Sequence, residues 1–535
     1  MVIQANVSAS AHIKKSKLIT LIYNLSGGTI NAQIIITVIA TLGAVANGTI
    51  LGWSSPAQVM LESENQVSFP VTDKDTQTFS SVFGIGAALG ALPAGYVSGL
   101  FGRRTSMMLF EGFLLVGWII LVYPTSVWML SVGRVLQGIG AGALCAIIPS
   151  YVGEIAEPQM RGRLGTVFQF LIVAGILFSY TFGAFLKYVP FCLLCAVWVL
   201  LHLLGALCIP ESPYYLMGKN HPERAAASLQ TLRGSSDTTE ELAAIKDFIE
   251  QQKAQSYTIS EVLSDKTNRK ALLISIGCMF FQQMSGINVV IFYMTDIFES
   301  TGSNISPNAC TITVGIVQLI MTMVSLSIID KSGRKLLLVI SSLLMAVCYA
   351  GLGGFYLIKK YNSTLAKDLY WLPLLCIAVY ISAFSIGSGP VPWVLMGEIF
   401  SSEVKPIGTS LTTCTNWTLV FVVTYVSNEL THWLGSSGCF LTFSAFCLMG
   451  AVFAMVIVPE TKNKSLAEIQ LRLVGKRAAA PRAAVSSIAM TETTTQLPTV
   501  VTDLPTVATD LPTVVTDSPT VVTEEAKVQE TSEIP

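Results

Sequence analysis

Long apolar segments separated by short polar ones run along most of the chain. A bilayer-spanning helix needs about 20 mostly apolar residues. Such runs occur at 33–53, 78–98, 105–123, 126–148, 164–186, 190–209, 270–297, 310–329, 336–358, 370–396, 407–430 and 438–458. A polar stretch, 210–269, separates the sixth run from the seventh. The pattern therefore predicts an all-α membrane protein with twelve transmembrane helices in two six-helix halves.

The same pattern predicts five regions along the chain. They are a polar N-terminal segment 1–32 without a signal peptide, a first half 33–209, a central loop 210–269 with short amphipathic helices, a second half 270–458, and a tail 459–535. The tail carries four seven-residue repeats of the type "LPTVVTD" from residue 497. A Pro in every repeat removes helix hydrogen bonds, so we expect disorder from about residue 490.

Composition supports the membrane assignment and excludes other classes. Charged residues make up 12% of the 535 residues, against about 25% in an ordinary soluble domain. The formal net charge of −1 gives no excess of basic residues for binding nucleic acid. The four His are scattered, and most Cys fall in apolar runs, so the chain offers no catalytic triad and no metal site. An enzyme is therefore disfavoured, and no cofactor is implied.

Basic residues predict the orientation in the membrane, because they favour the cytoplasmic side. Placing both termini in the cytoplasm puts these residues inside: Arg103, Arg104, Arg161, Arg163, Lys331, Arg334, Lys335 and Lys405. The sequons at Asn304 and Asn362 then fall in outside loops, where glycosylation is expected. We expect a multi-pass protein of the plasma membrane, although an internal membrane fits the same pattern.

Three motifs repeat in the same order in the two halves. "FGRRTS" matches "KSGRKLL", "GEIAEPQMRG" matches "GEIFSSEVKPIG", and "IPESP" matches "VPETK". The acid-to-base spacing in the middle pair is seven residues in both halves, Glu154 to Arg161 and Glu398 to Lys405. This repetition predicts duplicated, pseudo-symmetric halves, an arrangement typical of transporters with a site between them.

The stretch "FQQMSGINVVIFY" places Gln282, Gln283 and Asn288 inside an apolar run. An amide without a partner costs roughly 2–7 kcal/mol in an apolar medium, so these groups must bond other helices or line a wet cavity. An ideal helix would not place all three on one face. Gly286 between them can loosen the helix, and discontinuous helices are where midplane sites form.

From about residue 33 to 470 the chain resembles the sugar porter family of the major facilitator superfamily. The resemblance rests on "GRVLQGIGAG", "PSYVGEIAEPQMRG", "PESP", "QQMSGIN", "DKSGRK", "GSGPVPW" and "VPETKNKSLAEI". "PESPYY" and "TILGWSSPA" are most similar to the insect trehalose transporter-like branch. The resemblance implies the major facilitator fold and a small-molecule sugar as substrate. A neutral amide suits sugar hydroxyls, because it both donates and accepts hydrogen bonds.

The resemblance also implies the site residues. Those expected to bind sugar are Gln169, Gln282, Gln283, Asn288, Gln318, Trp393, Asn416 and Trp417. Those expected to form cytoplasmic ion pairs that hold the halves together when the outside is open are Arg103, Arg134, Glu154, Arg161, Glu211, Asp330, Arg334, Glu398, Lys405 and Glu460. The alternatives are bonds to a neighbouring helix for the amides and simple charge anchoring for the basic residues.

Three positions depart from the family pattern. Gly99 stands where the family has an acid, Tyr214 where many members have Arg, and Ser385 where some members have Glu. These changes leave the inner charge network thinner than the family's, and they do not touch the amides.

The first predicted helix lacks the acid that proton-coupled members carry there, and no ATP-binding loop motif is present. The sequence therefore favours a facilitator for a hexose or disaccharide, with glucose and trehalose as the leading candidates. A sugar sensor that signals through its tail, and a proton-coupled sugar or polyol carrier, remain alternatives. The oligomeric state stays open.

Overall fold

A computed structural model of the chain describes residues 32–62, 67–157, 160–234, 237–254, 259–302, 305–401, 404–464 and 466–473. Asn304 and the C-terminal repeats lie outside this part, as do the side chains of Arg161 and Asp330. All regular elements of the described residues are helices. The predicted all-α fold class is therefore confirmed.

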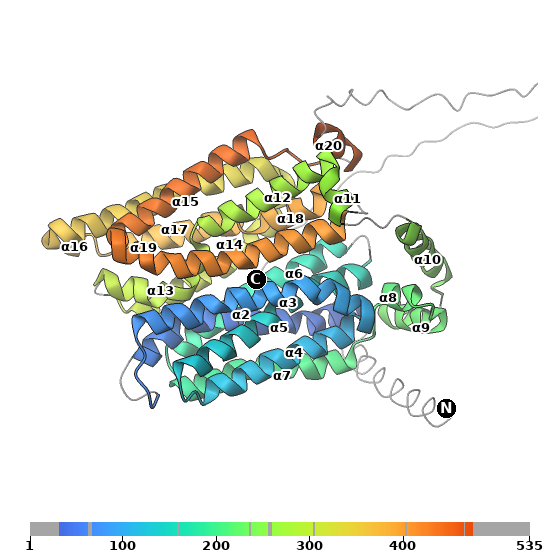
Figure 1. Cartoon of the computed structure of the whole chain (residues 1–535), viewed down its shortest axis with the longest axis horizontal. Coiled ribbons are helices and arrows are strands. Elements are labelled where there is room, and N and C mark those ends of the chain that lie inside the picture. Colours follow the sequence, from blue (N-terminus) through green and yellow to red (C-terminus); the bar gives the residue numbers. More distant parts are fainter. Residues whose placement is uncertain are drawn as a thin grey trace, which may run out of the picture. The chain divides into compact units, whose positions relative to one another are not determined.

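Six long helices form the first half, which is blue to green in Figure 1. They are α2 (Ala32–Glu62), α3 (Asp73–Phe101), α4 (Arg103–Val122), α5 (Val127–Ile155), α6 (Arg161–Gly183) and α7 (Tyr188–Cys208). The main packing partners are α3 with α5, α2 with α6, and α4 with both α5 and α7. Helix α2 continues beyond the predicted end at residue 53 and ends at the acidic Glu62.

The second half contains two spans that are each broken into two helices. The predicted run 270–297 is α12 (Lys266–Met284) followed by α13 (Ile287–Thr301), and 370–396 is α17 (Leu372–Ile386) followed by α18 (Pro390–Ile399). Helices α14 (Pro307–Ser332) and α15 (Arg334–Tyr361) are continuous. Helix α19 (Lys405–Val456) turns at Gly435, whose φ of 70° is left-handed. Counted on both sides of that turn, α19 supplies the eleventh and twelfth spans.

Short helices occupy the connections between the long ones. The loop between α7 and α12 holds α8 (Pro213–Gly218), α9 (Pro222–Arg233), α10 (Thr239–Ala254) and α11 (Ile259–Ser264). Helix α16 (Ser363–Asp368) follows α15, and α20 (Leu466–Leu473) follows α19. The side chain of Asn362 caps α16 by accepting from the N–H of Leu365 at 3.1 Å.

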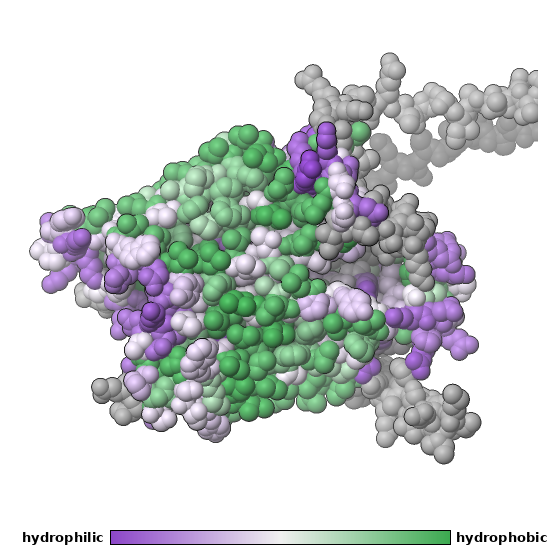
Figure 2. Space-filling model, viewed as in Figure 1, coloured by the Kyte–Doolittle hydropathy of each residue, from purple (hydrophilic) through white to green (hydrophobic). Residues whose placement is uncertain are grey.

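Apolar residues cover the middle of the surface in Figure 2, and hydrophilic residues gather at its two ends. Eleven helices of the described part are long and apolar enough to cross a membrane when α19 is counted once. Outward-facing side chains such as Leu89, Ile119 and Val347 are more than half exposed. Lipid tails solvate such side chains, whereas water would not.

Glycines allow α3 and α5 to approach backbone to backbone. A Cβ atom on Gly90 would lie 2.0 Å from the carbonyl oxygen of Ile139, and one on Gly142 would lie 2.1 Å from that of Ala87. Helices in lipid gain no hydrophobic driving force for association, so they depend on close van der Waals packing, which small residues permit. Gly95, on the same α3, has open space where a Cβ would stand.

We predict that Gly90→Ala destabilises the protein, because the added methyl meets a backbone oxygen that cannot move aside alone. Overpacking of this kind costs about 1–3 kcal/mol. Thermal unfolding of the purified protein in nanodiscs measures the effect as a lower midpoint temperature. Gly95→Ala is the matched control and should leave the midpoint unchanged; equal effects of the two changes would contradict the packing argument.

Candidate functional site

The break between α12 and α13 lies at Gly286, as the sequence predicts. Gly286 takes φ 76° and ψ 17°, a left-handed conformation that favours glycine. The hydroxyl of Tyr380 donates to the carbonyl of Ser285 at 2.9 Å, and the Ser285 hydroxyl donates to the carbonyl of Gln282 at 2.7 Å. Side chains thus pair the backbone groups that the break frees, as the interior of a membrane protein requires.

The break brings three amides into one hydrogen-bonded chain. Asn288 Nδ2 donates to Gln283 Oε1 at 2.5 Å, and Gln283 Nε2 donates to Asn416 Oδ1 at 2.7 Å. The three side chains belong to α13, α12 and α19, and all are buried. A chain of this kind keeps each amide polar and oriented inside an apolar bundle.

Gln282 joins the two broken spans. Its Nε2 donates to the carbonyls of Ser388 and Gly389, both at 2.8 Å, where α17 ends and α18 begins. The same break is supported by Ser341 on α15, whose hydroxyl donates to the Ala383 carbonyl at 2.8 Å and accepts from the Ser388 N–H at 3.0 Å. Breaks in two helices therefore meet at one glutamine.

The amides retain capacity for a ligand after these bonds are made. Each amide offers two N–H donors and an oxygen with two lone pairs. Gln282 spends both donors on carbonyls and keeps its oxygen, whereas Asn416 uses its oxygen and keeps its N–H groups. The cluster thus presents acceptors and donors side by side, which is the chemistry that a hydroxyl-rich neutral molecule needs.

The other four residues predicted for the site lie on α14, α18, α19 and α6. Gln318 on α14 is buried and its Oε1 has no hydrogen-bond partner, while Trp393 on α18 is half-buried. Trp417 on α19 packs edge-on against Phe83 with ring centroids 5.9 Å apart. Gln169 on α6 is exposed. Trp417 directly follows Asn416 in α19, and the place of the other three in the site stays a prediction.

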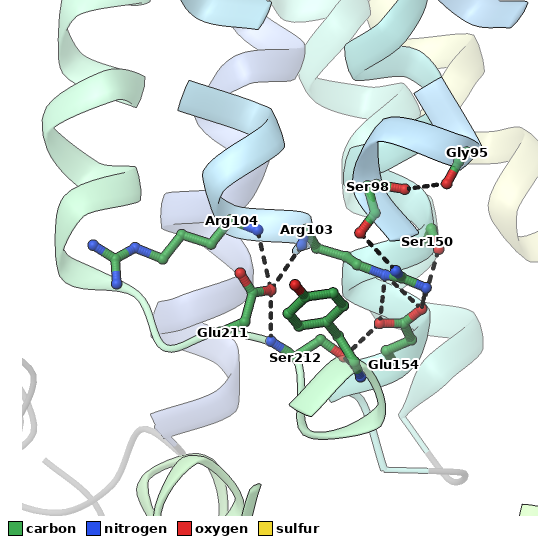
Figure 3. A network of polar contacts seen from close by, with 9 residues as sticks. Gly95, Ser98, Arg103, Arg104, Ser150, Glu154, Glu211 and Ser212 are labelled. Carbon is green, nitrogen blue, oxygen red and sulfur yellow. Dashed lines mark hydrogen bonds and ion pairs between the residues drawn. The ribbon is translucent and has the colours of Figure 1, made fainter. Parts of the chain in front are cut away.

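Of the ion-pair residues predicted in the first half, Arg103, Glu154 and Glu211 form one cluster, shown in Figure 3. Arg103, at the start of α4, pairs with Glu154, near the end of α5, at 2.9 Å. Ser212 donates to the same carboxylate. Glu211 accepts from the backbone N–H groups of Arg103 at 2.8 Å and Arg104 at 3.2 Å. The three motifs that repeat in the sequence therefore converge in space.

The second half repeats this cluster with the corresponding residues. Arg334, at the start of α15, pairs with Glu398 on α18 at 2.8 Å, and Thr461 donates to Glu398 at 2.6 Å. Glu460 accepts from the N–H groups of Arg334 at 3.0 Å and Lys335 at 3.1 Å. We call the helix ends that carry the two clusters the ion-pair end, and the opposite ends the far end.

A glycine precedes the arginine in both clusters because the carboxylate occupies the space of a side chain. A Cβ on Gly102 would lie 2.3 Å from Glu211 Oε2, and one on Gly333 would lie 2.7 Å from Glu460 Oε2. Both glycines also have positive φ, 96° and 88°. Another residue at either position would displace the carboxylate and strain the backbone.

The two capping carboxylates titrate differently although their geometry matches. Burial raises the pKa of Glu211, and the N–H groups of Ser212, Arg104 and Arg103 offset this only in part. Burial also acts to raise the pKa of Glu460, yet the N–H groups of Lys462, Arg334 and Lys335 outweigh it and hold that pKa below its usual value. The first-half cluster is therefore the one that takes up a proton more readily.

The assignment of Arg134 to the ion-pair clusters is wrong. Arg134 lies near the start of α5, whereas Glu154 lies at the opposite end of the same helix, roughly 30 Å away at 1.5 Å per residue. Arg134 is fully buried at the far end. It donates to the Ile50 carbonyl at 3.1 Å and to Ser54 Oγ at 2.9 Å. The motif specifies the residue type and not its position along the helix.

Three more residues are predicted to form ion pairs, namely Arg161, Asp330 and Lys405. Lys405 is exposed and donates to the Gly397 carbonyl at 2.8 Å, next to Glu398. The side chains of Arg161 and Asp330 are outside the described part, so their predicted pairs stay predictions. The pairs Arg103–Glu154 and Arg334–Glu398 each join helices of one half.

The two halves contact each other toward the far end. Ser55 bonds Thr295 at 2.8 Å, Tyr180 bonds the Ile291 carbonyl at 2.9 Å, and Gln77 bonds the Tyr425 carbonyl. Helix α2 packs against α13, α3 against α19 and α6 against α14, and the Tyr180 bond connects α6 to α13 as well. Neither these bonds nor the serines at the helix breaks were found from the sequence. Isolated polar residues in apolar runs were a signal for these contacts, but the neighbouring sequence did not indicate which residues they bond.

Comparisons with known proteins agree with this architecture. The model of the family "Sugar (and other) transporter" matches residues 36–473. "Facilitated trehalose transporter Tret1" of Anopheles gambiae is 35% identical over 448 residues, which cover 83% of this chain and 56% of that protein. The protein of the same name from Culex quinquefasciatus is 34% identical over 447 residues, 83% of this chain and 86% of that one. This chain thus spans little more than half of the mosquito relative from Anopheles and most of the one from Culex.

One solved structure is the proton:xylose symporter XylE of the major facilitator superfamily, bound to 6-bromo-6-deoxy-D-glucose. It superposes with a TM-score of 0.67 at 26% identity, covering 83% of this chain and 99% of that chain. The family match covers both six-helix halves, the amide cluster and the two ion-pair clusters. The chain therefore belongs to the sugar transporter family of the major facilitator superfamily.

Proposed function

We propose that this protein is a facilitative transporter that carries a hexose or disaccharide across a membrane by alternating access. The observation that carries the proposal is the amide cluster of Gln282, Gln283, Asn288 and Asn416 where two broken helices meet. Neutral groups that both donate and accept suit a sugar, which brings many hydroxyls and no charge. The relatives named as trehalose transporters support trehalose as the substrate, with glucose as the alternative.

The packing of the two halves supports alternating access. The ion-pair end is proposed to face the cytoplasm, in accordance with the basic residues there, and the membrane is proposed to be the plasma membrane. The interhalf bonds lie at the far end, which supports a state closed toward the outside. Ion pairs that lie within each half can rearrange when the halves rock, and so can bias one state over the other.

The surroundings of Arg134 support passive transport. This buried cation contacts α2, where proton-coupled relatives would place an acid, and its partners are neutral: the Ile50 carbonyl, Ser54 and Gln137. Its guanidinium also lies over the rings of Trp53, at 5.1 Å, and Phe83, at 4.8 Å. Neutral partners exchange no proton, so sugar movement at this point needs no proton movement.

One observation favours proton coupling as the second candidate. Glu111 on α4 and His202 on α7 form a fully buried pair inside the first half. A Cβ on Gly43 of α2 would lie 2.6 Å from the His202 ring, so α2 packs directly on the pair. Titratable groups inside a membrane bundle are commonly functional, and XylE couples xylose to protons.

We predict saturable uptake of labelled glucose or trehalose into liposomes that hold the purified protein. Gln282→Ala should lower the uptake rate at low sugar concentration about tenfold, because the site loses both an acceptor and the hydrogen bonds to Ser388 and Gly389 before α18. Gln230→Ala, an exposed amide on α9, is the control and should be neutral. Sugar binding without flux would refute the transporter and favour a sensor.

We predict that an imposed proton gradient leaves the final level of sugar in these liposomes equal to the outside concentration. Passive transport stops at equality, whereas a symporter accumulates sugar. Accumulation that follows the gradient would refute the uniporter. If Glu111→Gln then abolished accumulation and left equilibrating flux, the Glu111–His202 pair would be the proton site.

Glu398→Gln should slow turnover and leave sugar affinity unchanged. The carboxylate holds the end of α18 to Arg334 and Thr461, remote from the amides, so its loss affects rocking of the halves more than binding. Comparing the maximal uptake rate with the binding constant separates the two effects. Glu250→Gln, in an exposed pair with Lys246 at 4.0 Å, should change neither, since such pairs contribute little. Weaker binding with an unchanged rate would contradict the assignment.

A further inference from the structure

Helix α13 departs from helical geometry at one residue near the far end. Tyr293 has φ −118° and ψ 19°. It lies midway between Ile291 and Thr295, whose carbonyl and N–H an uninterrupted α-helix would pair with each other. The shape of α13 at this point therefore depends on the hydrogen-bond partners of the Ile291 carbonyl and the Thr295 N–H.

Each of these two groups has a partner on the first half of the protein. The Tyr180 hydroxyl of α6 donates to the Ile291 carbonyl at 2.9 Å. The Thr295 N–H donates to Ser55 Oγ of α2 at 3.0 Å, and the hydroxyls of Ser55 and Thr295 are 2.8 Å apart. Tyr180 and Ser55 are 2% and 0% exposed, so water does not share these bonds.

Buried backbone groups in a membrane protein need a protein partner in every populated state. When the far end opens, α2 and α6 move away from α13, and Tyr180 and Ser55 go with them. The Ile291 carbonyl and the Thr295 N–H are then left with each other, and a return of Tyr293 to helical angles pairs them. Neither state has to bury an unpaired group.

We propose that Ser55 and Tyr180 are positioning residues of the outer gate, which close it by taking over the backbone hydrogen bond of α13 at Ile291 and Thr295. Closing exchanges one bond within a helix for bonds between the halves, so the open and closed states stay close in free energy. This inference rests on the proposed alternating access and specifies what sets its equilibrium at the far end.

The packing around the gate fits this exchange. A Cβ on Gly315 of α14 would lie 3.2 Å from the Tyr180 ring, so the glycine leaves room for that ring against the second half. Next to Tyr293, Phe292 meets Phe83 of α3 with ring centroids 6.2 Å apart. Thr311 of α14 lies 3.3 Å from the Thr295 hydroxyl and gives it a second partner. The contacts of Tyr180 and Ser55 with α13 are thus closely packed on all these sides.

The test measures the far-end opening directly, without sugar. Spin labels attached to Trp128→Cys and Tyr361→Cys report the distance between the halves by double electron–electron resonance in nanodiscs, in a background without the native cysteines. Trp128 and Tyr361 are 82% and 79% exposed at far-end helix termini of opposite halves. The labels therefore replace no packed side chain.

Tyr180→Phe and Ser55→Ala should each shift the population about fivefold toward the longer, open distance, the effect of losing one hydrogen bond. The matched controls lose equivalent bonds inside the first half: Tyr188→Phe, whose hydroxyl donates to the Leu121 carbonyl at 2.8 Å, and Ser179→Ala, whose hydroxyl donates to the Thr49 carbonyl at 2.8 Å. The controls should leave the distances unchanged.

Unshifted distances in Tyr180→Phe and Ser55→Ala would overturn the proposal, and so would equal shifts in the controls. Thermal unfolding of each variant shows whether it is folded, and Tyr180→Phe keeps the ring, so packing is preserved. The distance measurement needs no transport. A protein that opens and closes as described but moves no sugar would refute the proposed function and leave the gate intact.

Discussion

The backbone of a membrane protein must find all its hydrogen-bond partners within the protein. This chain nevertheless interrupts its helices, both at the proposed sugar site and at the proposed gate. The breaks at Gly286 and at Gly387–Gly389, and the bend at Tyr293, free backbone groups in an apolar interior. Tyr380, Ser341, Gln282 and Tyr180 supply partners for these groups. The same side chains consequently fix the shape of the site and connect its helices to one another.

Duplication explains why the ion-pair end is built twice. In each half a carboxylate, Glu211 or Glu460, accepts N–H bonds at the start of a helix and fills the space that a glycine leaves open. The following Arg then reaches a second carboxylate, Glu154 or Glu398. Gly99 and Tyr214 make the first cluster differ from the family pattern, yet its pair still forms, and the ring of Tyr215 lies 5.9 Å from the Arg103 guanidinium. The thinner network expected from the sequence is thus partly replaced by an aromatic contact.

The sequence predicted those features of the structure that depend on neighbouring residues, and it did not predict contacts between residues far apart in the chain. Apolar run length located the spans, and Gly286 marked the break, because both depend on neighbouring residues. The resemblance to the family implied ion pairs at Arg103, Glu154, Arg334 and Glu398, and the structure contains the pairs Arg103–Glu154 and Arg334–Glu398. The partners of Gln282 and Tyr180 lie more than a hundred residues away and carry no local signal. Arg134 was misplaced for a related reason: its motif specifies a residue type, and only its distance from the helix start specifies which end of the membrane it occupies.

The amides can hold the helices and serve the proposed sugar site together, because the two roles use different groups of the same side chains. Gln283 is held between Asn288 and Asn416, and Gln282 holds two carbonyls. In the proposed site a sugar hydroxyl bonds the groups that these contacts leave over, the Gln282 oxygen and the Asn416 N–H groups, and each such hydrogen bond contributes only about 0.5–1.5 kcal/mol net. The internal bonds leave only part of the amide groups to a sugar and so keep its affinity modest, which a carrier requires because a tightly held ligand would leave too slowly. The internal bonds of the cluster therefore keep the empty site stable and keep the occupied site reversible.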